Sequence, residues 1–556
     1  MSTAPAAASP VSAWAPLRIR VYRALWIAQF TSNVGTWMQT VAAQWLMGSL
    51  TPDPLLVALI QTAMTLPIFL VGFPAGALGD IFDRRRLLLG SQTFMLLAAA
   101  LLAALTIAGE TTPTVLLALT FALGLGQALT APSWQAIQPQ LVGRELIPQA
   151  SALGATSMNL ARAVGPAVGG ALVAASGPGW VFVINGISFL GVLVVVARWK
   201  RESPAKVLGP EHVGSALRAG IRFVRSSPRT RTVLIRAFTF VLFATGLWAL
   251  LPVVARSNLG LTSGGYGLLL GAVGLGAVTG AWTLPRARAR WSLDRVVIVA
   301  SLAFGGAMLV LAWVEVVPLV ALALVVTGYC WIAVISSLNA STQLVLPDWV
   351  RSRGLGVYLL VLQGGQALGA VIWGVVASSL GTDVALSTVA GGLGAGLLVA
   401  RRWPLRTGAI DVTPSRHWPE PELAWEPAPA DGPVLVSVEY EVPSENAEAF
   451  RDAMQWVGRA RRRTGAERWG LFQDGADPER VVEAYVVPTW DEHLRQHHQR
   501  YTRTDQHYEQ RAHGLLREGT VPHLRHLFFA GPSGGGRARA ARSQRPHNRG
   551  ARGRAG

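Results

Sequence analysis

The strongest constraint on this sequence is the recurrence of apolar runs separated by short polar connections. A helix needs roughly 20 mostly apolar residues to cross the hydrocarbon core of a bilayer. With that window, twelve spans are predicted near residues 23–48, 54–78, 87–108, 113–137, 150–176, 180–198, 233–255, 264–285, 295–314, 318–345, 355–380 and 384–402. Only 14% of the 556 residues are charged, whereas soluble domains carry about 25%. We therefore expect a multi-pass membrane protein.

The formal net charge of +18 follows the connections between the spans. Alternate connections are rich in arginine, and the others are short and nearly free of it. Because arginines that flank membrane helices stay in the cytoplasm, both termini are predicted to be cytoplasmic. The protein itself is predicted to reside in the inner (plasma) membrane. The basic charge is thus a topology signal, and no nucleic-acid motif accompanies it. The single cysteine, Cys330, excludes a disulfide framework.

The longest internal connection divides the spans into two sets of six, which predicts two related halves. The segment 162–170, "RAVGPAVGG", aligns without gaps with 366–374, "QALGAVIWG", and both lie in the fifth span of a half. Repeats of this kind are typical of transporters. The predicted divisions are a cytoplasmic tail at 1–21, a six-helix half at 22–199, a central loop at 200–232 and a second half at 233–404.

The last 150 residues have a different character. A Pro-rich acidic linker is predicted at 405–432, and a disordered basic tail at 531–556. Between them, 433–530 alternate strands and helices in β-α-β-β-α-β order, which predicts a ferredoxin-like α+β domain. Its strands are expected at 434–442, 467–474, 480–487 and 523–529.

Five polar side chains interrupt the first apolar run at regular spacing. At about 100° per residue they share an arc of roughly 80° on one helix face. A polar stripe facing lipid would be costly, so it must face protein or water. The stripe consists of Gln29, Asn33, Thr36, Thr40 and Gln44.

The connection between the second and third spans, "GALGDIFDRRR" (76–86), carries a recognisable motif. It resembles the loop signature of the major facilitator superfamily, which Gly76, Asp80, Arg85 and Arg86 fit and from which Ile81 and Asp83 depart. Segments such as "SNVGTWMQ" (32–39) are similar to the branch of enterobactin exporters and macrolide effluxers. The resemblance covers about residues 18–405 and implies a twelve-helix transporter with no enzymatic activity, no catalytic residues and no cofactor. It also implies that Asp80 and its basic neighbours act in gating; the alternative is a loop that only sets topology.

The fifth span carries "ARAVGPAVGG" (161–170), which resembles the antiporter motif of the same superfamily. Gly165, Pro166, Gly169 and Gly170 match, while Ala161 replaces the first glycine. The resemblance implies export coupled to protons, and the alternative is ordinary packing of small residues.

Arg162 lies about twelve residues into the same span, roughly 18 Å deep. An intramembrane charge is a functional hypothesis by default. The alternatives are a structural bond to helix carbonyls or a misplaced span boundary. No acidic residue lies clearly mid-span to pair with it, so Asp80 is the leading candidate for carrying a proton.

The superfamily resemblance implies that spans one, four, seven and ten line a central cavity. Spans four and ten also show polar and aromatic stripes, and interhelical hydrogen bonding is the alternative for each. The stripes consist of Thr120, Gln127, Thr130, Trp134 and Gln138 in span four, and of Tyr329, Ser336, Asn339 and Gln343 in span ten.

In the C-terminal domain, His493 and His497 have the i, i+4 spacing of metal ligands on a helix. No third ligand follows at a clear spacing, so a solvated helix face is favoured and no metal is expected. The domain resembles dimeric α+β barrels of the antibiotic-biosynthesis monooxygenase type, a group that often lacks a defined catalytic residue set, and it is a candidate for dimerisation.

The leading interpretation is an exporter of amphipathic small molecules, such as a drug, siderophore or secondary metabolite, driven by protons with alternating access. Two alternatives stay open: a cytoplasmic enzyme or sensor tethered to a membrane scaffold, and an importer on the same fold.

Overall fold

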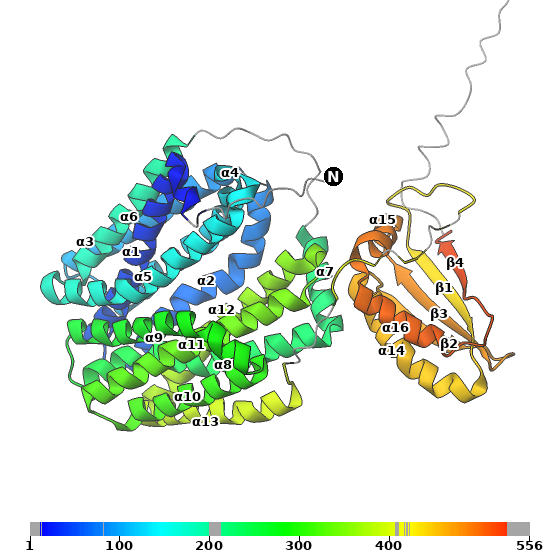
Figure 1. Ribbon diagram of the computed structural model, residues 1–556. Coiled ribbons are helices and arrows are strands. Elements are labelled where there is room, and N and C mark those ends of the chain that lie inside the picture. Colours follow the sequence, from blue (N-terminus) through cyan, green and yellow to red (C-terminus); the bar gives the residue numbers. More distant parts are fainter. Residues whose placement is uncertain are drawn as a thin grey trace, which may run out of the picture. The chain divides into compact units, whose positions relative to one another are not determined.

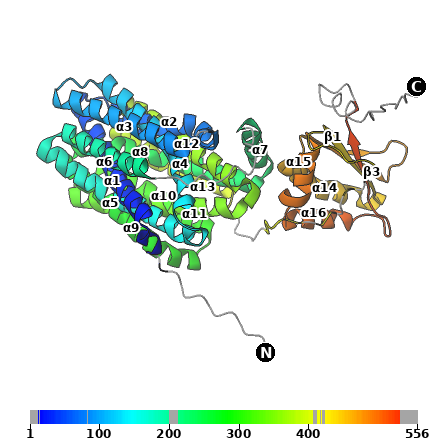
Figure 2. The same cartoon turned by 90° about the horizontal axis from the view of Figure 1, so that it is seen from above.

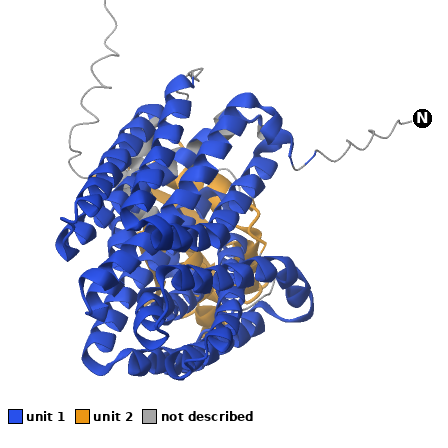
Figure 3. Cartoon of the chain, turned by 90° about the vertical axis from the view of Figure 1, so that its left-hand side faces the viewer, with its two compact units in different colours: residues 1–410 blue, residues 411–556 orange. Residues whose placement is uncertain are grey.

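The computed structural model describes residues 12, 14–81, 83–199, 213–405, 411–415, 417–418, 421 and 423–530. The side chains of residues 73–81, 84, 132–133, 135–136, 138–140, 144 and 213–219 are not part of this description. The predicted basic tail and most of the predicted N-terminal tail therefore lie outside the described residues. The chain divides into two compact units, Met1–Ile410 and Asp411–Gly556, which we call the helical unit and the C-terminal unit (Figure 3).

The helical unit contains two bundles joined by the short helix α7, Val213–Ser226 (Figure 1). The first bundle consists of α1 (Arg20–Leu50), α2 (Pro54–Ile81), α3 (Arg84–Ile107), α4 (Pro113–Leu141), α5 (Ile147–Ser176) and α6 (Pro178–Arg198). The second bundle consists of α8 (Pro228–Val253), α9 (Ser263–Arg290), α10 (Leu293–Trp313), α11 (Val317–Val345), α12 (Arg351–Leu380) and α13 (Thr382–Arg402).

Eleven helices within the described residues are long and apolar enough to cross a membrane. They correspond to eleven of the twelve predicted spans. The helix that does not meet this criterion is α1, although its 31 residues exceed the length that a span requires. The five stripe residues and the arginines Arg20 and Arg23 give α1 its lower hydropathy.

The two bundles meet mainly along two helix pairs, α2 with α12 and α5 with α9. Small residues make the second pair close. A Cβ atom added at Gly170 would lie 2.6 Å from the carbonyl oxygen of Ser263 and 2.7 Å from the Cα atom of Gly267. One added at Gly274 would lie 2.6 Å from the Cα atom of Ala163. Glycine is therefore required here because the two backbones touch.

The C-terminal unit is a four-stranded antiparallel sheet with helices on one side (Figure 2). The strand order is β2-β3-β1-β4, and each strand lies where the sequence alternation predicts it. The elements are β1 (Val434–Glu441), α14 (Ala447–Thr464), β2 (Arg468–Gln473), β3 (Arg480–Val487), α15 (Trp490–Arg495), α16 (Arg503–His513) and β4 (His523–Phe528).

The alternation along β1 decides which side chains form the core of this unit. Val434, Val436 and Val438 are buried in one cluster with Phe450 and Met454 of α14. The intervening residues point to the other face, where the sheet register places Leu435 opposite Val486 of β3 and Leu527 of β4. Leu527 is 49% exposed there.

Candidate functional site

A cavity of about 460 Å³ lies between the two bundles of the helical unit. Its size is that of a small-molecule binding site. The lining side chains are mainly amides, hydroxyls, indoles and thioethers. They include Gln29, Asn33, Thr36, Trp37, Thr40, Gln44, Gln61, Met64, Thr65, Gln92, Met95, Gln127, Thr130, Trp134, Met158, Arg162, Trp248, Trp331, Gln363 and Gln366.

All five residues of the polar stripe on α1 line this cavity. The stripe is ordered along the helix, since Gln29 Nε2 donates to Asn33 Oδ1 at 2.9 Å and the Thr40 hydroxyl donates to the Thr36 carbonyl at 3.0 Å. A second hollow of about 490 Å³ shares Gln29 and Asn33 with the cavity and follows the first half of α1. The stripe thus runs from this hollow into the cavity.

The opposite end of the stripe is sealed by contacts between the bundles. Gln44 Nε2 donates to the carbonyl of Trp248 on α8 at 3.0 Å, and its Oε1 accepts from the Tyr266 hydroxyl of α9 at 2.7 Å. Gln44 and Tyr266 are 3% and 1% exposed. One amide therefore ties α1 to two helices of the other bundle and closes this end of the cavity.

A row of aromatic rings crosses the sealed end from one bundle to the other. Trp37 of α1 lies 6.4 Å from Trp248 of α8, and Trp248 lies 5.6 Å from Trp331 of α11, measured between ring centroids. Arg162 of α5 begins the row, with its guanidinium carbon 5.3 Å from the centroid of Trp37. The mid-span arginine thus borders the cavity and contacts an indole ring.

Span ten is placed differently from its prediction. The cavity lining does not include the predicted stripe of α11, namely Tyr329, Ser336, Asn339 and Gln343. The side chains of this stripe form hydrogen bonds with α9 or with one another. Arg288 of α9 donates to the hydroxyls of Ser336 and Ser337 at 2.8 and 2.9 Å. Tyr329 accepts from Thr283 at 3.3 Å, and Gln343 donates to Asn339 at 2.8 Å. Interhelical and local hydrogen bonding, the alternative considered above, describes these residues.

Part of the predicted stripe of span four, which is α4, lines the cavity. Gln127, Thr130 and Trp134 line the cavity, Thr120 is buried away from it, and the side chain of Gln138 lies outside the described residues. The sequence reasoning missed the contributions of α2, α3 and α12, and it expected α8 and α11 at the cavity without recognising the tryptophans through which they line it. Glutamines within apolar runs were the available signal, because a buried amide requires partners. The missed residues include Gln61, Gln92, Trp248, Trp331, Gln363 and Gln366.

The residues of the loop signature are described only in part. Gly76 and Asp80 fall in α2 where the side chains lie outside the described residues. Arg85 donates to the carbonyls of Val196 and Ala197 at 3.0 and 2.5 Å, so it caps the end of α6 in its own bundle. Arg86 is exposed, and its backbone N–H donates to Asp83 at 3.0 Å.

The departure from the signature at Asp83 has a local explanation. Asp83 is the N-cap of α3, with φ −63°, so its backbone does not require the glycine that the family pattern has at this position. A carboxylate at the start of a helix stabilises the first turn.

The glycine motif of α5 allows close contact with two helices, α1 and α9. A Cβ atom added at Gly165 would lie 2.6 Å from Trp37 Cβ, and one at Gly169 would lie 2.7 Å from Met38 Cα, both on α1. Gly170 faces α9 of the other bundle, and the Pro166 carbonyl would lie 2.9 Å from a Cβ atom at Gly267. The motif therefore sits where α1, α5 and α9 meet.

The aligned segment of α12 repeats this arrangement. Gly369, which aligns with Gly165, approaches Leu242 of α8, the first helix of its own bundle. Gly374, which aligns with Gly170, approaches Leu55 and Ala58 of α2 in the other bundle. The internal repeat in the sequence thus corresponds to equivalent contacts in the two bundles.

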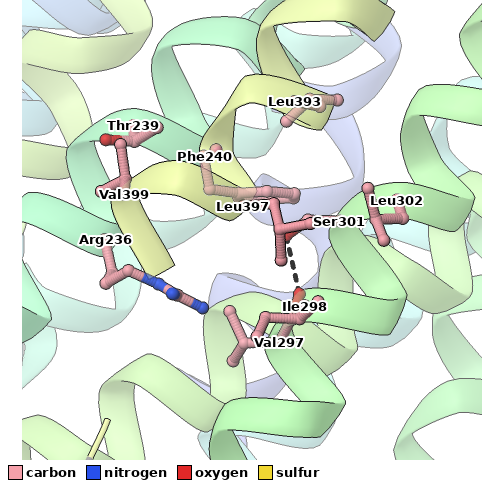
Figure 4. A pocket seen from close by; sticks show the side chains of 11 residues that line it. Arg236, Thr239, Phe240, Val297, Ile298, Ser301, Leu302, Leu393, Leu397 and Val399 are labelled. Carbon is pink, nitrogen blue, oxygen red and sulfur yellow. Dashed lines mark hydrogen bonds between the residues drawn. The ribbon is translucent and has the colours of Figure 1, made fainter. Parts of the chain in front are cut away.

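A separate pocket, between α8, α10 and α13, is too small for a solute (Figure 4). Its volume of about 30 Å³ leaves room for only one or two water molecules. Arg236 lines it and forms an ion pair with Asp294 at 3.4 Å. Asp294 also accepts the backbone N–H of Leu405 at 3.2 Å, so this ion pair joins the ends of three helices.

The C-terminal unit has a buried charged cluster around Arg461. Arg461 Nε donates to Glu483 at 3.0 Å, and its Nη2 contacts Glu509 at 2.6 Å. Burial alone lowers the pKa of Arg461, but the two carboxylates raise it well above its usual value. Trp418, from the predicted linker, covers the guanidinium at 4.6 Å and donates to Glu509 at 2.9 Å. Part of the predicted linker is thus packed on this unit.

The histidine pair of the predicted solvated helix face is buried instead. His493 and His497 are 1% and 4% exposed, and His493 Nε2 lies 2.9 Å from His526 Nε2 of β4. They are covered because their helix packs against the sheet. Burial lowers the pKa of both rings, that of His497 to about 4. Among the described residues, no group of three or more candidate ligands could hold a metal ion.

The comparisons with known proteins all identify membrane transporters as similar to this chain. The model of a family described as transmembrane secretion effector, of the major facilitator type, matches residues 11–532. The multidrug efflux pump Tap of Mycolicibacterium fortuitum is 25% identical over 376 residues, which cover 65% of this chain and 90% of that protein. The enterobactin exporter EntS of Shigella boydii serotype 4 is 26% identical over 381 residues, 66% of this chain and 88% of the exporter.

Solved structures share the fold of the helical unit. A nucleoside transporter aligns with a TM-score of 0.57 at 12% identity over 69% of this chain and 99% of its own. A bacterial homologue of the iron transporter ferroportin aligns with a TM-score of 0.54 at 15% identity over 70% of this chain and 99% of its own.

Proposed function

Because the chain belongs to the transmembrane secretion effector family of major facilitator transporters, we propose that it exports amphipathic small molecules through the cavity between its two bundles. The family consists of multi-pass membrane transporters rather than enzymes. The substrates that we propose are drugs, siderophores or secondary metabolites, in keeping with the names of the two relatives.

The observation that carries this proposal is the placement of the α1 stripe. Its amides and hydroxyls line the cavity together with indole rings from α1, α4, α8 and α11. Uncharged polar groups interleaved with aromatic rings suit a bulky ligand that is apolar with a few hydrogen-bonding groups.

We further propose that α1 is the twelfth span and that both termini are cytoplasmic. Its length and its packing along α5 and α6 support the first point, and the arginine-rich connections support the second. The end sealed at Gln44 is then extracellular, and the hollow along the first half of α1 opens to the cytoplasm. Transport would alternate between this state and one in which Gln44 releases α8 and α9.

The coupling ion proposed is the proton, with Asp80 as its carrier and gating group, on the strength of the family loop and the Gly-Pro motif. For the C-terminal unit we propose a ferredoxin-like fold, supported by the strand order β2-β3-β1-β4. The apolar side chains on the open sheet face, Leu435, Val486 and Leu527 among them, support pairing with a second copy.

Cysteine labelling tests the cavity directly. In a Cys330→Ser background, cysteines at Asn33, Thr36 and Thr40 should react with a water-soluble thiol reagent, and a transported drug should slow the reaction. The matched controls are cysteines at Val34, Met38 and Ala42 on the other faces of the same helix, which should stay unreactive. Equal labelling of all positions, or none on the stripe, would mean that the stripe serves packing and that the cavity is not the substrate site.

A further inference from the structure

The cavity contains a single formal charge among its described lining residues, the guanidinium of Arg162. The other lining residues are neutral, and the ion pairs found in the described part of the chain do not include Arg162. Its Nε atom is buried without a hydrogen-bond partner among the described residues, and its guanidinium carbon lies 5.3 Å from the centroid of the Trp37 ring, which covers one side of the group. A desolvated cation is costly unless an anion pairs with it. The cavity therefore favours an anion beside Arg162.

The position of Arg162 relative to the aromatic row restricts the ligand further. The guanidinium lies at one end of the row formed by Trp37, Trp248 and Trp331. The indole Nε1 of Trp248 is also buried and has no hydrogen-bond partner within the described ranges. An aromatic group placed along this row would contact the indole rings, which are tilted relative to one another, while its anionic substituent reaches Arg162.

Two further groups with unused hydrogen-bonding capacity lie on the same cavity. Gln29 Oε1 and Gln92 Oε1 are buried acceptors that find no partner in the described part of the chain. A hydroxyl or N–H group of a ligand would satisfy each of these acceptors. Among the described lining residues, the unsatisfied buried atoms thus comprise two donors, on Arg162 and Trp248, and two amide acceptors.

We propose that the cavity selects aromatic amphiphiles that carry an organic anion such as a carboxylate or sulfonate, with the anion on Arg162 and the ring along Trp37 and Trp248. This inference rests on the proposed function, because it concerns the same cavity. Organic cations are disfavoured, since the described lining offers them no carboxylate and one repelling charge.

A pair of fluorescent probes that differ by one sulfonate tests the inference. They are 1-anilinonaphthalene-8-sulfonate and its neutral parent N-phenyl-1-naphthylamine. The full-length protein, with Cys330→Ser and Thr36→Cys, is placed in lipid nanodiscs, and each probe is titrated against the rate of thiol labelling. Empty nanodiscs correct for partitioning into lipid. We expect the sulfonate to protect at a concentration at least about tenfold lower than the neutral probe.

Variants of two arginines separate the cavity charge from general effects. Arg162→Gln should abolish the tenfold preference and leave protection by the neutral probe unchanged, and Arg162→Lys should retain part of the preference. The matched control is Arg256→Gln, because Arg256 also lies over an indole, Trp45 at 5.5 Å, but outside this cavity. It should leave both titrations unchanged.

Each outcome decides between the two proposals. Equal protection by both probes in the Arg162 protein overturns the anion selectivity and leaves the cavity as the substrate site. An undiminished preference in Arg162→Gln overturns the role of this side chain. Protection by neither probe counts against the proposed function itself. If Arg162→Gln does not fold, the comparison of the two probes in the Arg162 protein still decides the question.

Discussion

Replacing Gly170 with alanine is expected to loosen the sealed end of the cavity, because the new methyl group meets backbone rather than a movable side chain. It would lie 2.6 Å from the Ser263 carbonyl oxygen and 2.7 Å from Gly267 Cα. Ordinary contacts between such atoms are about 3.5 Å, so α5 and α9 must separate by nearly 1 Å. The contact that they lose is the one that holds the two bundles together beside Tyr266.

The magnitude follows from the cost of overpacking. Inserting a methyl group into a well-packed contact costs about 1–3 kcal/mol. If that cost falls only on the state in which α5 and α9 touch, the equilibrium shifts roughly five- to 150-fold toward the state in which they separate.

The assay measures access to the cavity from outside the cell. Thr40→Cys in a Cys330→Ser background places a thiol in the cavity at a position that is 9% exposed. A membrane-impermeant reagent added to intact cells should label it slowly in the parent and five- to 150-fold faster with Gly170→Ala, provided that the sealed end is extracellular.

The matched control is Gly191→Ala on α6, where an added Cβ meets nothing within 4 Å. Both substitutions gain about 1 kcal/mol of helix propensity, so only the clash differs between them. An unchanged labelling rate with Gly170→Ala would refute the view that α5–α9 contact keeps this end closed. Rapid labelling of the parent would instead refute the proposed orientation.

Three further predictions concern the loop, the C-terminal unit and its histidines. Asp80→Asn should lower efflux by about tenfold, corresponding to roughly 1.4 kcal/mol, at unchanged membrane expression; normal efflux would remove Asp80 from the mechanism. Deletion of residues 411–556 should leave measurable efflux, since the helical unit has its own core, and complete loss from a correctly inserted protein would indicate that the C-terminal unit couples to transport. In residues 411–530 expressed alone, burial and then the neighbouring charges lower the pKa of His497 from 6.5 to about 4. The neutral ring therefore stabilises the fold fully above pH 6.5, and up to about 3 kcal/mol is lost as the pH falls to 4. Urea titrations of His497→Gln should show a flatter pH dependence, and an unchanged one would contradict this assignment.

The sequence predicted the apolar spans, the strands of the C-terminal unit and the side chains that share a helix face. These properties are local, because they follow from runs of about 20 apolar residues and from the periods of helix and strand. The alignment of Gly165 with Gly369 was also found from the sequence, and the two glycines make equivalent contacts in the two bundles. The glutamines of α2, α3 and α12 were not recognised because one or two amides in a span are too few to form a periodic stripe.

What the sequence could not determine is the neighbour that each face meets. The stripes of α1 and α11 look alike, with amides and hydroxyls on one side, yet Asn33 borders the cavity whereas Ser336 accepts a hydrogen bond from Arg288. Likewise, His493 and His497 share a helix face by their spacing, but the packing of that helix against β4 buries them. Periodicity determines which residues point in the same direction, and that was in the sequence. Whether water, lipid or another helix lies in that direction depends on long-range packing between segments far apart in the chain, which only the tertiary structure decided.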